Sequence, residues 1–222
     1  MQSEFEFVAS VEQTKPANTG FASPRRMGPV VPPHPFLPGC EPGQPYVLFL
    51  GLLLPEKAAA ATDDLSASLA REHGLWGRRI GRERLHVSLH QVGVSEGQVP
   101  LDVVARVSRA LEGFRLPPFD VTFGRVSTFE RADPSRPLVL LCDCGLEALA
   151  DLHRQLRSRL RQWRFKGLAR SFNPHVTLLY DARVVPEQAV PPVAWTVSEV
   201  VLVCSARGLS RYGVFGRWRL AG

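Results

Sequence analysis

The chain has 222 residues, of which 45% are hydrophobic and 22% charged, so it can bury a core as one large domain or two small lobes. Its formal net charge of +6 favours anionic partners such as phosphate groups or nucleic acids. The four cysteines fit neither a disulfide framework nor a zinc-binding spacing, and no signal peptide or apolar run of about 18 residues occurs. We therefore expect a cytoplasmic protein that does not enter a membrane.

Residues 1–44 are rich in proline and show little apolar periodicity. Such a composition is typical of a flexible tail. From Tyr46 onward the pattern changes to regular alternation of apolar runs and amphipathic segments. The sequence therefore predicts a flexible N-terminal tail over 1–44 and a folded domain over 45–222.

A strand, helix and histidine-containing strand are predicted twice along the chain. The first unit comprises the apolar run YVLFLGLLL (46–54), a helical pattern over 55–74 and the strand that contains His86. The second comprises RPLVLLCD (136–143), a helix over 145–163 and the strand that contains His175. This repetition indicates two related lobes.

The remaining segments complete an α+β pattern. A helix is expected around 101–114 and a strand over 119–129. Two further strands are expected over 194–206 and 211–220. Strands that alternate with helices and end in hairpins favour an α+β fold of two lobes, whose histidine strands would face each other across a cleft.

Two short motifs stand at matching places in the repeated units. They read HVSL (86–89) and HVTL (175–178). Because successive side chains of a strand point to opposite faces, His86 and Ser88 share one face, and His175 and Thr177 share another. By the same alternation, His90 should lie on the face of His86, either in contact with substrate or at its rim.

These residue types suit the opening of a phosphodiester. Two imidazoles with an ordinary pKa of about 6.5 can supply both a base for the attacking water and an acid for the departing oxygen. The hydroxyls of Ser88 and Thr177 can donate to the non-bridging oxygens, where negative charge grows. A zinc site is not expected, because His86 and His90 would stand about 13 Å apart on a regular strand. The sequence therefore predicts neither a metal nor another cofactor.

The paired motifs, together with HGLWGRRIGRERLHVSLHQVG and FNPHVTLLYD, resemble the 2H phosphoesterase superfamily, and within it the bacterial 2′-5′ RNA ligase-like (LigT-like) RNA 2′,3′-cyclic phosphodiesterases. The resemblance covers about residues 46–220. It implies a bilobal fold with two pseudo-twofold-related antiparallel sheets, helices outside and a central cleft. It also implies hydrolysis of 2′,3′-cyclic phosphates to 2′-phosphates, with reversible 2′-5′ ligation. By motif position, His86 and His175 would be the catalytic pair, and Ser88 and Thr177 would bind phosphate.

Two positions depart from the pattern of the family. Relatives often carry an aromatic residue in place of Gln91 and a cation in place of Tyr180. Tyr180 can hydrogen-bond or stack but cannot neutralise a phosphate. Another cation must then supply the charge, and the candidates are Arg84, with its neighbours in RRIGRER, and Arg170. We therefore expect Tyr180, Arg84 and Arg170 to contact the substrate, in addition to the residues of the two motifs.

Several alternatives remain open at this point. The resemblance places His86 as the general acid and His175 as the base, but the near-symmetry of the motifs allows the reverse. The arginines of the helix over 145–163 form either a solvated basic face or an RNA contact. The expected partner is an RNA or oligonucleotide with a 2′,3′-cyclic phosphate, bound by a monomer. The rival functions are a phosphodiesterase for cyclic nucleotides, 2′-5′ oligonucleotides or ADP-ribose cyclic phosphate, and a non-catalytic RNA-binding module.

Overall fold

The computed structural model describes residues 45–132, 134–206 and 212–222. The predicted tail over 1–44 lies outside these residues. Among the described residues, no helix is long and apolar enough to cross a membrane. The elements follow in the order β1 (Pro45–Leu53), α1 (Glu56–Glu72), β2 (Arg78–Arg79), the short 3₁₀ helix η1 (Arg82–Arg84), β3 (His86–Glu96), α2 (Leu101–Ala110), β4 (Phe119–Thr128), β5 (Arg136–Cys144), α3 (Leu146–Gln162), β6 (His175–Asp181), β7 (Gln188–Val197), β8 (Glu199–Ala206) and β9 (Gly213–Arg219).

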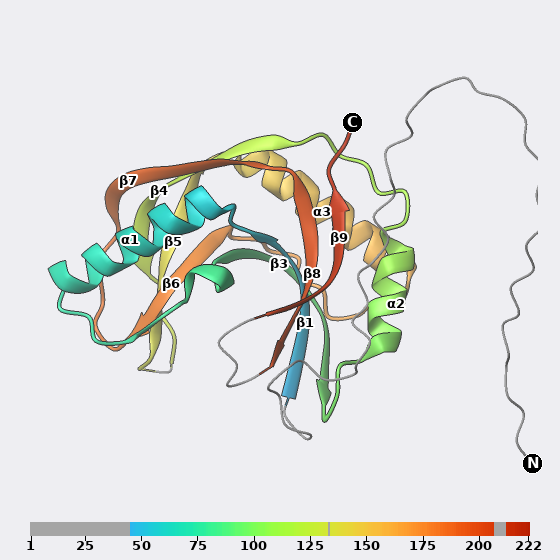
Figure 1. Ribbon diagram of the computed structural model, residues 1–222, viewed down its shortest axis with the longest axis horizontal. Coiled ribbons are helices and arrows are strands. Elements are labelled where there is room, and N and C mark those ends of the chain that lie inside the picture. The colour runs from blue at the N-terminus through green and yellow to red at the C-terminus, as the bar shows by residue number, and fades with distance from the viewer. Residues whose placement is uncertain (1–44, 133, 207–211) are drawn as a thin grey trace, which may run out of the picture.

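The strands form one antiparallel sheet with two halves. Its order is β7-β4-β5-β6-β3-β1-β8-β9, and β2 pairs with the outer part of β6. The halves meet between β6 and β3, where a single residue pair, Val87 with Val176, joins the strands. Figure 1 shows the sheet arching over from β5 and β6 to β1 and β8. The predicted α+β fold is confirmed, and both strand–helix–strand units are present as β1-α1-β3 and β5-α3-β6.

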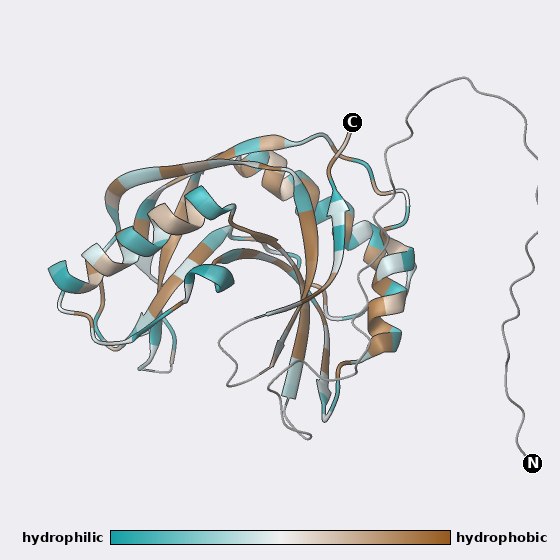
Figure 2. Ribbon diagram, in the orientation of Figure 1, coloured by the Kyte–Doolittle hydropathy of each residue, from teal (hydrophilic) through white to brown (hydrophobic). Residues whose placement is uncertain are grey.

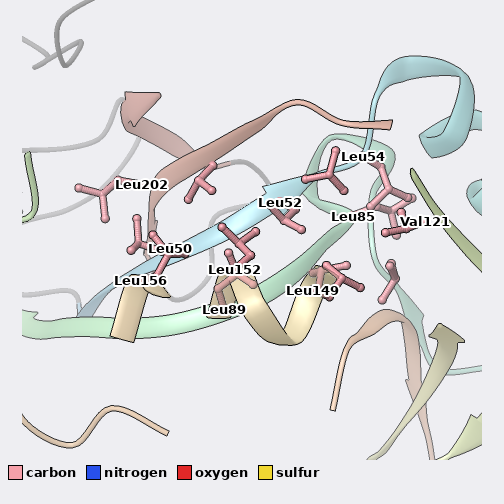
Figure 3. Packing of buried hydrophobic residues seen from close by; sticks show 14 of the residues in the cluster. Leu50, Leu52, Leu54, Leu85, Leu89, Val121, Leu149, Leu152, Leu156 and Leu202 are labelled. Atoms are coloured by element: carbon pink, nitrogen blue, oxygen red, sulfur yellow. The ribbon is translucent and has the colours of Figure 1, made fainter. Parts of the chain in front are cut away.

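Each repeated unit sends its helix to the other half of the sheet. The first-unit helix α1 contacts β6 and β7, whereas α3 contacts β3 and is flanked by α2. The inner face of α3 is fully buried through Leu149, Leu152, Leu156 and Leu160. Figure 3 shows three of these leucines among residues of β1, β3 and β8. This exchange of helices fixes the two halves relative to each other, because each helix belongs by sequence to one half and by packing to the other.

The hydrophobic core follows the central strands. Figure 2 shows hydrophobic residues concentrated along β1 and β8, whereas α1 and α3 alternate hydrophilic and hydrophobic residues. Burying this apolar face contributes about 25 cal/mol per Å² of surface removed from water. The amphipathic periodicity that predicts α3 from sequence is therefore the same property that holds it against the sheet.

Strand β7 extends further toward the N-terminus than the sequence predicts. It begins at Gln188 and includes Pro191 and Pro192, both exposed. Proline lacks the N–H that a central strand needs, but β7 is the edge of the sheet, and the prolines fall where the register with β4 shifts beside Gly124. The segment over 194–206 is divided at Ser198 into the end of β7 and the whole of β8.

Candidate active site

The two histidine motifs come together where the halves of the sheet join. His86 begins β3 and His175 begins β6, and the strands are antiparallel and paired through the next residues, Val87 and Val176. In this register Ser88 is the neighbour of His175 across the strands, and Thr177 is the neighbour of His86. The antiparallel register therefore relates the two motifs by a local twofold axis between β3 and β6.

Both imidazoles are oriented by the same local device. Nδ1 of His86 donates to the carbonyl oxygen of Arg84 at 2.7 Å, and Nδ1 of His175 donates to that of Asn173, also at 2.7 Å. In neutral rings this leaves the lone pair on Nε2, because each ring carries one proton and a carbonyl can only accept. Nε2 of His86 lies 2.9 Å from the hydroxyl oxygen of Ser88. Both rings therefore present a proton-accepting atom, and both can deliver a proton once charged.

His86 is enclosed by aromatic rings. Phe49 lies 4.9 Å away between ring centroids, and Tyr212 lies edge-on at 5.4 Å. The guanidinium of Arg84 covers the Tyr212 ring at 4.9 Å. Burial lowers the pKa of His86 to about 4, and the positive charges of Arg84 and His175 act in the same direction, against the hydrogen bond to the Arg84 carbonyl. At neutral pH the free protein therefore holds His86 uncharged.

The surroundings of His175 are less enclosed. Its aromatic neighbour is Phe129, whose ring centroid lies 5.0 Å away in an edge-on arrangement. Sequence reasoning singled out neither Phe129 nor Phe49 and Tyr212. Phe49 and Phe129 belong to apolar stretches that read as core, and Tyr212 is 126 positions from His86, so no local spacing connects them. The aromatic enclosure consequently breaks the symmetry that the two motifs show in sequence.

The predicted position of His90 is wrong. Strand β1 pairs Gly51 with Ser88 but the preceding Leu50 with His90, so Leu89 is an extra residue in β3. Such a β-bulge reverses the alternation of side chains beyond it. His90 therefore faces the core, where it is 2% exposed, and is not accessible to a substrate at the site.

The second motif has the same bulge at the same place. Strand β5 pairs Val139 with Thr177 but the preceding Leu138 with Leu179, which leaves Leu178 as the extra residue. Leu179 is fully buried and is thus the equivalent of His90 in the second unit. The bulge is a shared feature of both motifs, and it limits the exposed part of each to the histidine and the hydroxyl residue.

In the core, His90 forms part of a stack of three rings. Its Nε2 donates to the backbone carbonyl of His153 at 2.9 Å, and the two imidazoles stack at 4.0 Å. His153 stacks in turn on Phe172 at 4.4 Å. His153 is 4% exposed, and Phe172 packs against the core. These residues are structural.

This stack predicts a loss of stability in mild acid. Burial lowers the pKa of His153 to about 4, helped by the charges of His90 and Arg157. Because the folded pKa is below the unfolded one, the stability is complete above about pH 6.5 and is lost as the pH falls toward 4. We expect His153→Phe, whose ring can keep the stack, to remove on the order of 1–2 kcal/mol of the stability difference between pH 7 and pH 5. Tm measured against pH tests this, and parallel curves for both proteins would contradict it.

Of the arginines expected to neutralise the phosphate, some lie beside the histidines and others do not. Arg84 is half-buried beside His86 and Tyr212. Arg79 and Arg82 instead form ion pairs with acidic residues of α1. Arg170 is exposed in the segment between α3 and β6. Of the arginines in the RRIGRER run, Arg84 is therefore the one that the fold places against a catalytic candidate.

Tyr180 lies near the end of β6, after the buried Leu178 and Leu179. It is half-buried, pairs with Arg78 of β2, and lies close enough to Tyr212 to raise its pKa, beside the larger effect of burial. This places a second phenol near the enclosure of His86. Among the described residues, no group of three or more histidine, cysteine or acidic side chains could hold a metal ion. A hollow of about 400 Å³ between α1 and β7 includes neither histidine.

The two halves of the sheet, each with a histidine–x–hydroxyl motif at their junction, define a 2H phosphoesterase. A family model described as the 2′-5′ RNA ligase superfamily matches residues 54–209. The chain therefore belongs to the 2′-5′ RNA ligase superfamily, and the predicted LigT-like resemblance is confirmed.

Solved structures of other proteins have the same fold. E. coli LigT in apo form is 27% identical, with a TM-score of 0.63 over 81% of this chain and 99% of that one. E. coli LigT complexed with 3′-AMP is 26% identical, with a TM-score of 0.59 over 81% and 99%. The protein TT0787 of Thermus thermophilus is 23% identical, with a TM-score of 0.61 over 79% and 98%, and supports the fold alone. No curated protein matches the chain.

Proposed function

We propose that the protein hydrolyses the 2′,3′-cyclic phosphate ends of RNA to 2′-phosphomonoesters by metal-independent acid–base catalysis. The observation that carries this proposal is the meeting of two imidazoles, each with Nδ1 on a carbonyl and Nε2 available, beside two hydroxyls. Superfamily membership supports a phosphoesterase. The net charge of +6 favours an anionic polymer as the substrate.

In the proposed reaction one imidazole takes a proton from water as the water oxygen attacks phosphorus. The bond from phosphorus to O3′ breaks, and the second imidazole gives its proton to O3′, leaving the phosphate on O2′. Charge that builds on the non-bridging oxygens would be met by the hydroxyls of Ser88 and Thr177 and by the guanidinium of Arg84. Attack by a 5′ hydroxyl in place of water would give the reversible 2′-5′ ligation.

The aromatic enclosure suggests which histidine has which role. The lowered pKa of His86 favours the neutral ring in the free enzyme, and a neutral ring is ready to accept a proton. We therefore assign His86 as the base that activates water and His175 as the acid at O3′. This is the reverse of the assignment that the family resemblance implies, and the sequence motifs allow both.

Product analysis tests the proposed function directly. We expect the full chain to convert 2′,3′-cyclic AMP to the 2′-monophosphate, observed by phosphorus NMR, and to do so at the same rate with and without EDTA. The imidazoles supply both proton transfers, so the chemistry needs no metal-bound water. Accumulation of the 3′-monophosphate would contradict the proposed regiochemistry, and loss of turnover in EDTA would contradict metal independence.

A substrate smaller than RNA is the main alternative. E. coli LigT has been solved in complexes with 3′-AMP, ATP and NADP+, which shows that nucleotides bind to that relative. A panel of cyclic mononucleotides, 2′-5′ oligonucleotides, ADP-ribose cyclic phosphate and RNA with cyclic ends separates the possibilities. An RNA enzyme should show the highest kcat/KM on the longest cyclic-ended substrate.

A further inference from the structure

The second half of α3 and the segment after it form an unusually basic stretch. Residues 154–170 contain no acidic residue, and their cations are Arg154, Arg157, Arg159, Arg161, Arg164, Lys166 and Arg170. Some of these have structural partners: Arg154 pairs with Asp151, and Arg159 bonds the Glu112 carbonyl. Arg161, Arg164 and Lys166 are exposed and have no ion pair within the described part of the chain.

The helix dipole accounts for only part of this charge. Cations in the last turn of a helix are favourable, but the effect fades beyond that turn, and Arg164 and Lys166 follow the last helical residue, Gln162. Like charges four positions apart, such as Arg157 and Arg161, destabilise a helix slightly. A cluster of this kind is therefore retained at some cost in stability, which an anionic ligand would offset.

Arg164 provides a separate sign that its side chain is used. It has φ of 60°, in the left-handed region that favours glycine, and the amide of Phe165 closes the helix by donating to the Leu160 carbonyl at 3.1 Å. Helix α1 ends in the same way, with Gly74 at φ of 60° and Leu75 bonded to the corresponding carbonyl. An arginine thus stands where the equivalent helix has the residue that fits the conformation.

An aromatic side chain lies within this cluster. Trp163 is 38% exposed, and its carbonyl accepts a hydrogen bond from Arg106, whose guanidinium covers the Phe165 ring at 4.4 Å. This contact fixes the turn that presents the cations. An exposed indole beside unpaired cations is the combination that binds single-stranded nucleic acid, by base stacking and phosphate contacts.

We propose that Arg161, Trp163, Arg164 and Lys166, here called the α3-end surface, bind the single-stranded RNA chain that leads to the cyclic phosphate. This inference rests on the proposed function and specifies its substrate as an oligonucleotide rather than a mononucleotide. In sequence, this surface is followed by a segment that leads to His175 at the start of β6, so the same stretch of chain carries the surface and a member of the catalytic pair. The three cations would each contact one phosphate.

The test compares 2′,3′-cyclic AMP with a cyclic-ended RNA of about 12 nucleotides, a length within the range bound by single-strand sites. Three phosphate contacts should give log kcat/KM for the RNA a slope against log salt steeper by about 2 than for the mononucleotide. This corresponds to about 20-fold between about 50 and 200 mM salt. We expect the difference in slope between the two substrates to fall by about 0.7 in each of the variants Arg161→Gln, Arg164→Gly and Lys166→Gln. Turnover of 2′,3′-cyclic AMP should not change in any of them.

Arg164→Gly is the most informative variant, because a structural role and a binding role predict opposite results. Glycine fits the left-handed position, so Tm should stay the same or rise by up to about 4 °C while RNA turnover becomes less salt-dependent. Arg71→Gln removes an exposed cation from the last turn of α1 and serves as the charge-matched control, with no change in the slope. A slope equal to that of the wild type in all three variants overturns the inference.

The proposed function and this inference fail in distinguishable ways. If no cyclic substrate is turned over, the proposed function fails. Whether the α3-end surface binds RNA is then tested by the Kd of the same RNA, measured by fluorescence anisotropy. A higher Kd in the variant that combines Arg161→Gln, Arg164→Gly and Lys166→Gln supports RNA binding by this surface, and an unchanged Kd overturns it. If both substrates are turned over with equal salt slopes, the proposed function stands and the α3-end surface does not bind RNA.

Discussion

Replacement of either His86 or His175 by alanine is expected to lower kcat on 2′,3′-cyclic AMP by about 10²–10⁴, the usual contribution of a positioned acid or base. Each ring is held by its own carbonyl, at Arg84 and Asn173, so neither can move to do the work of the other. The double variant should be little worse than the poorer single variant, because residues that act as one unit are not additive. Steady-state kinetics on the three proteins measure this.

The matched control is another histidine of the same strand. His90→Leu removes an imidazole four positions from His86 and introduces the side chain that stands at the equivalent place in the second unit, Leu179. It should keep kcat within a few-fold of the wild type, since His90 faces the core. If His86→Ala and His175→Ala also retain kcat within a few-fold, the two-histidine mechanism is wrong for this protein.

The main features of the fold could be predicted because they depend on local periodicity. The leucines of α3 recur on one face, and the continuous apolar runs of β1 and β5 are buried along most of their length. The duplication of the histidine motif in two strand–helix–strand units also predicted that the motifs are related. Their meeting at Val87 and Val176 is the spatial form of that repetition.

The parts that were missed depend on contacts that sequence spacing does not encode. The bulge at Leu89 adds one residue to β3 without any turn signal such as glycine, so simple alternation placed His90 on the wrong face. The enclosure of His86 by Phe49 and Tyr212 brings together β1 and the residue before β9, which are remote in sequence. Such tertiary contacts decide the electrostatics of the site, whereas the motifs decide only its residue types.

The second large effect concerns pH. With His86 as the base and its pKa near 4, kcat/KM on 2′,3′-cyclic AMP should stay near its plateau down to about pH 5. A base with an unperturbed pKa of about 6.5 would leave only about 3% of the plateau at pH 5, a difference of about 30-fold. Because kcat/KM reports groups of the free enzyme, its acidic limb measures His86 without the charge of a bound phosphate.

A pair of aromatic substitutions assigns this limb to a particular histidine. Tyr212→Ala opens the enclosure of His86 to water, so the acidic limb should move up toward about 6.5, since burial is the main cause of the lowered pKa. Phe129→Ala makes the corresponding change beside His175 and should leave the acidic limb in place. If the limb of the wild type already lies near 6.5 and Tyr212→Ala does not move it, His86 is charged in the working enzyme. It is then the proton donor to O3′, and the water is activated by His175.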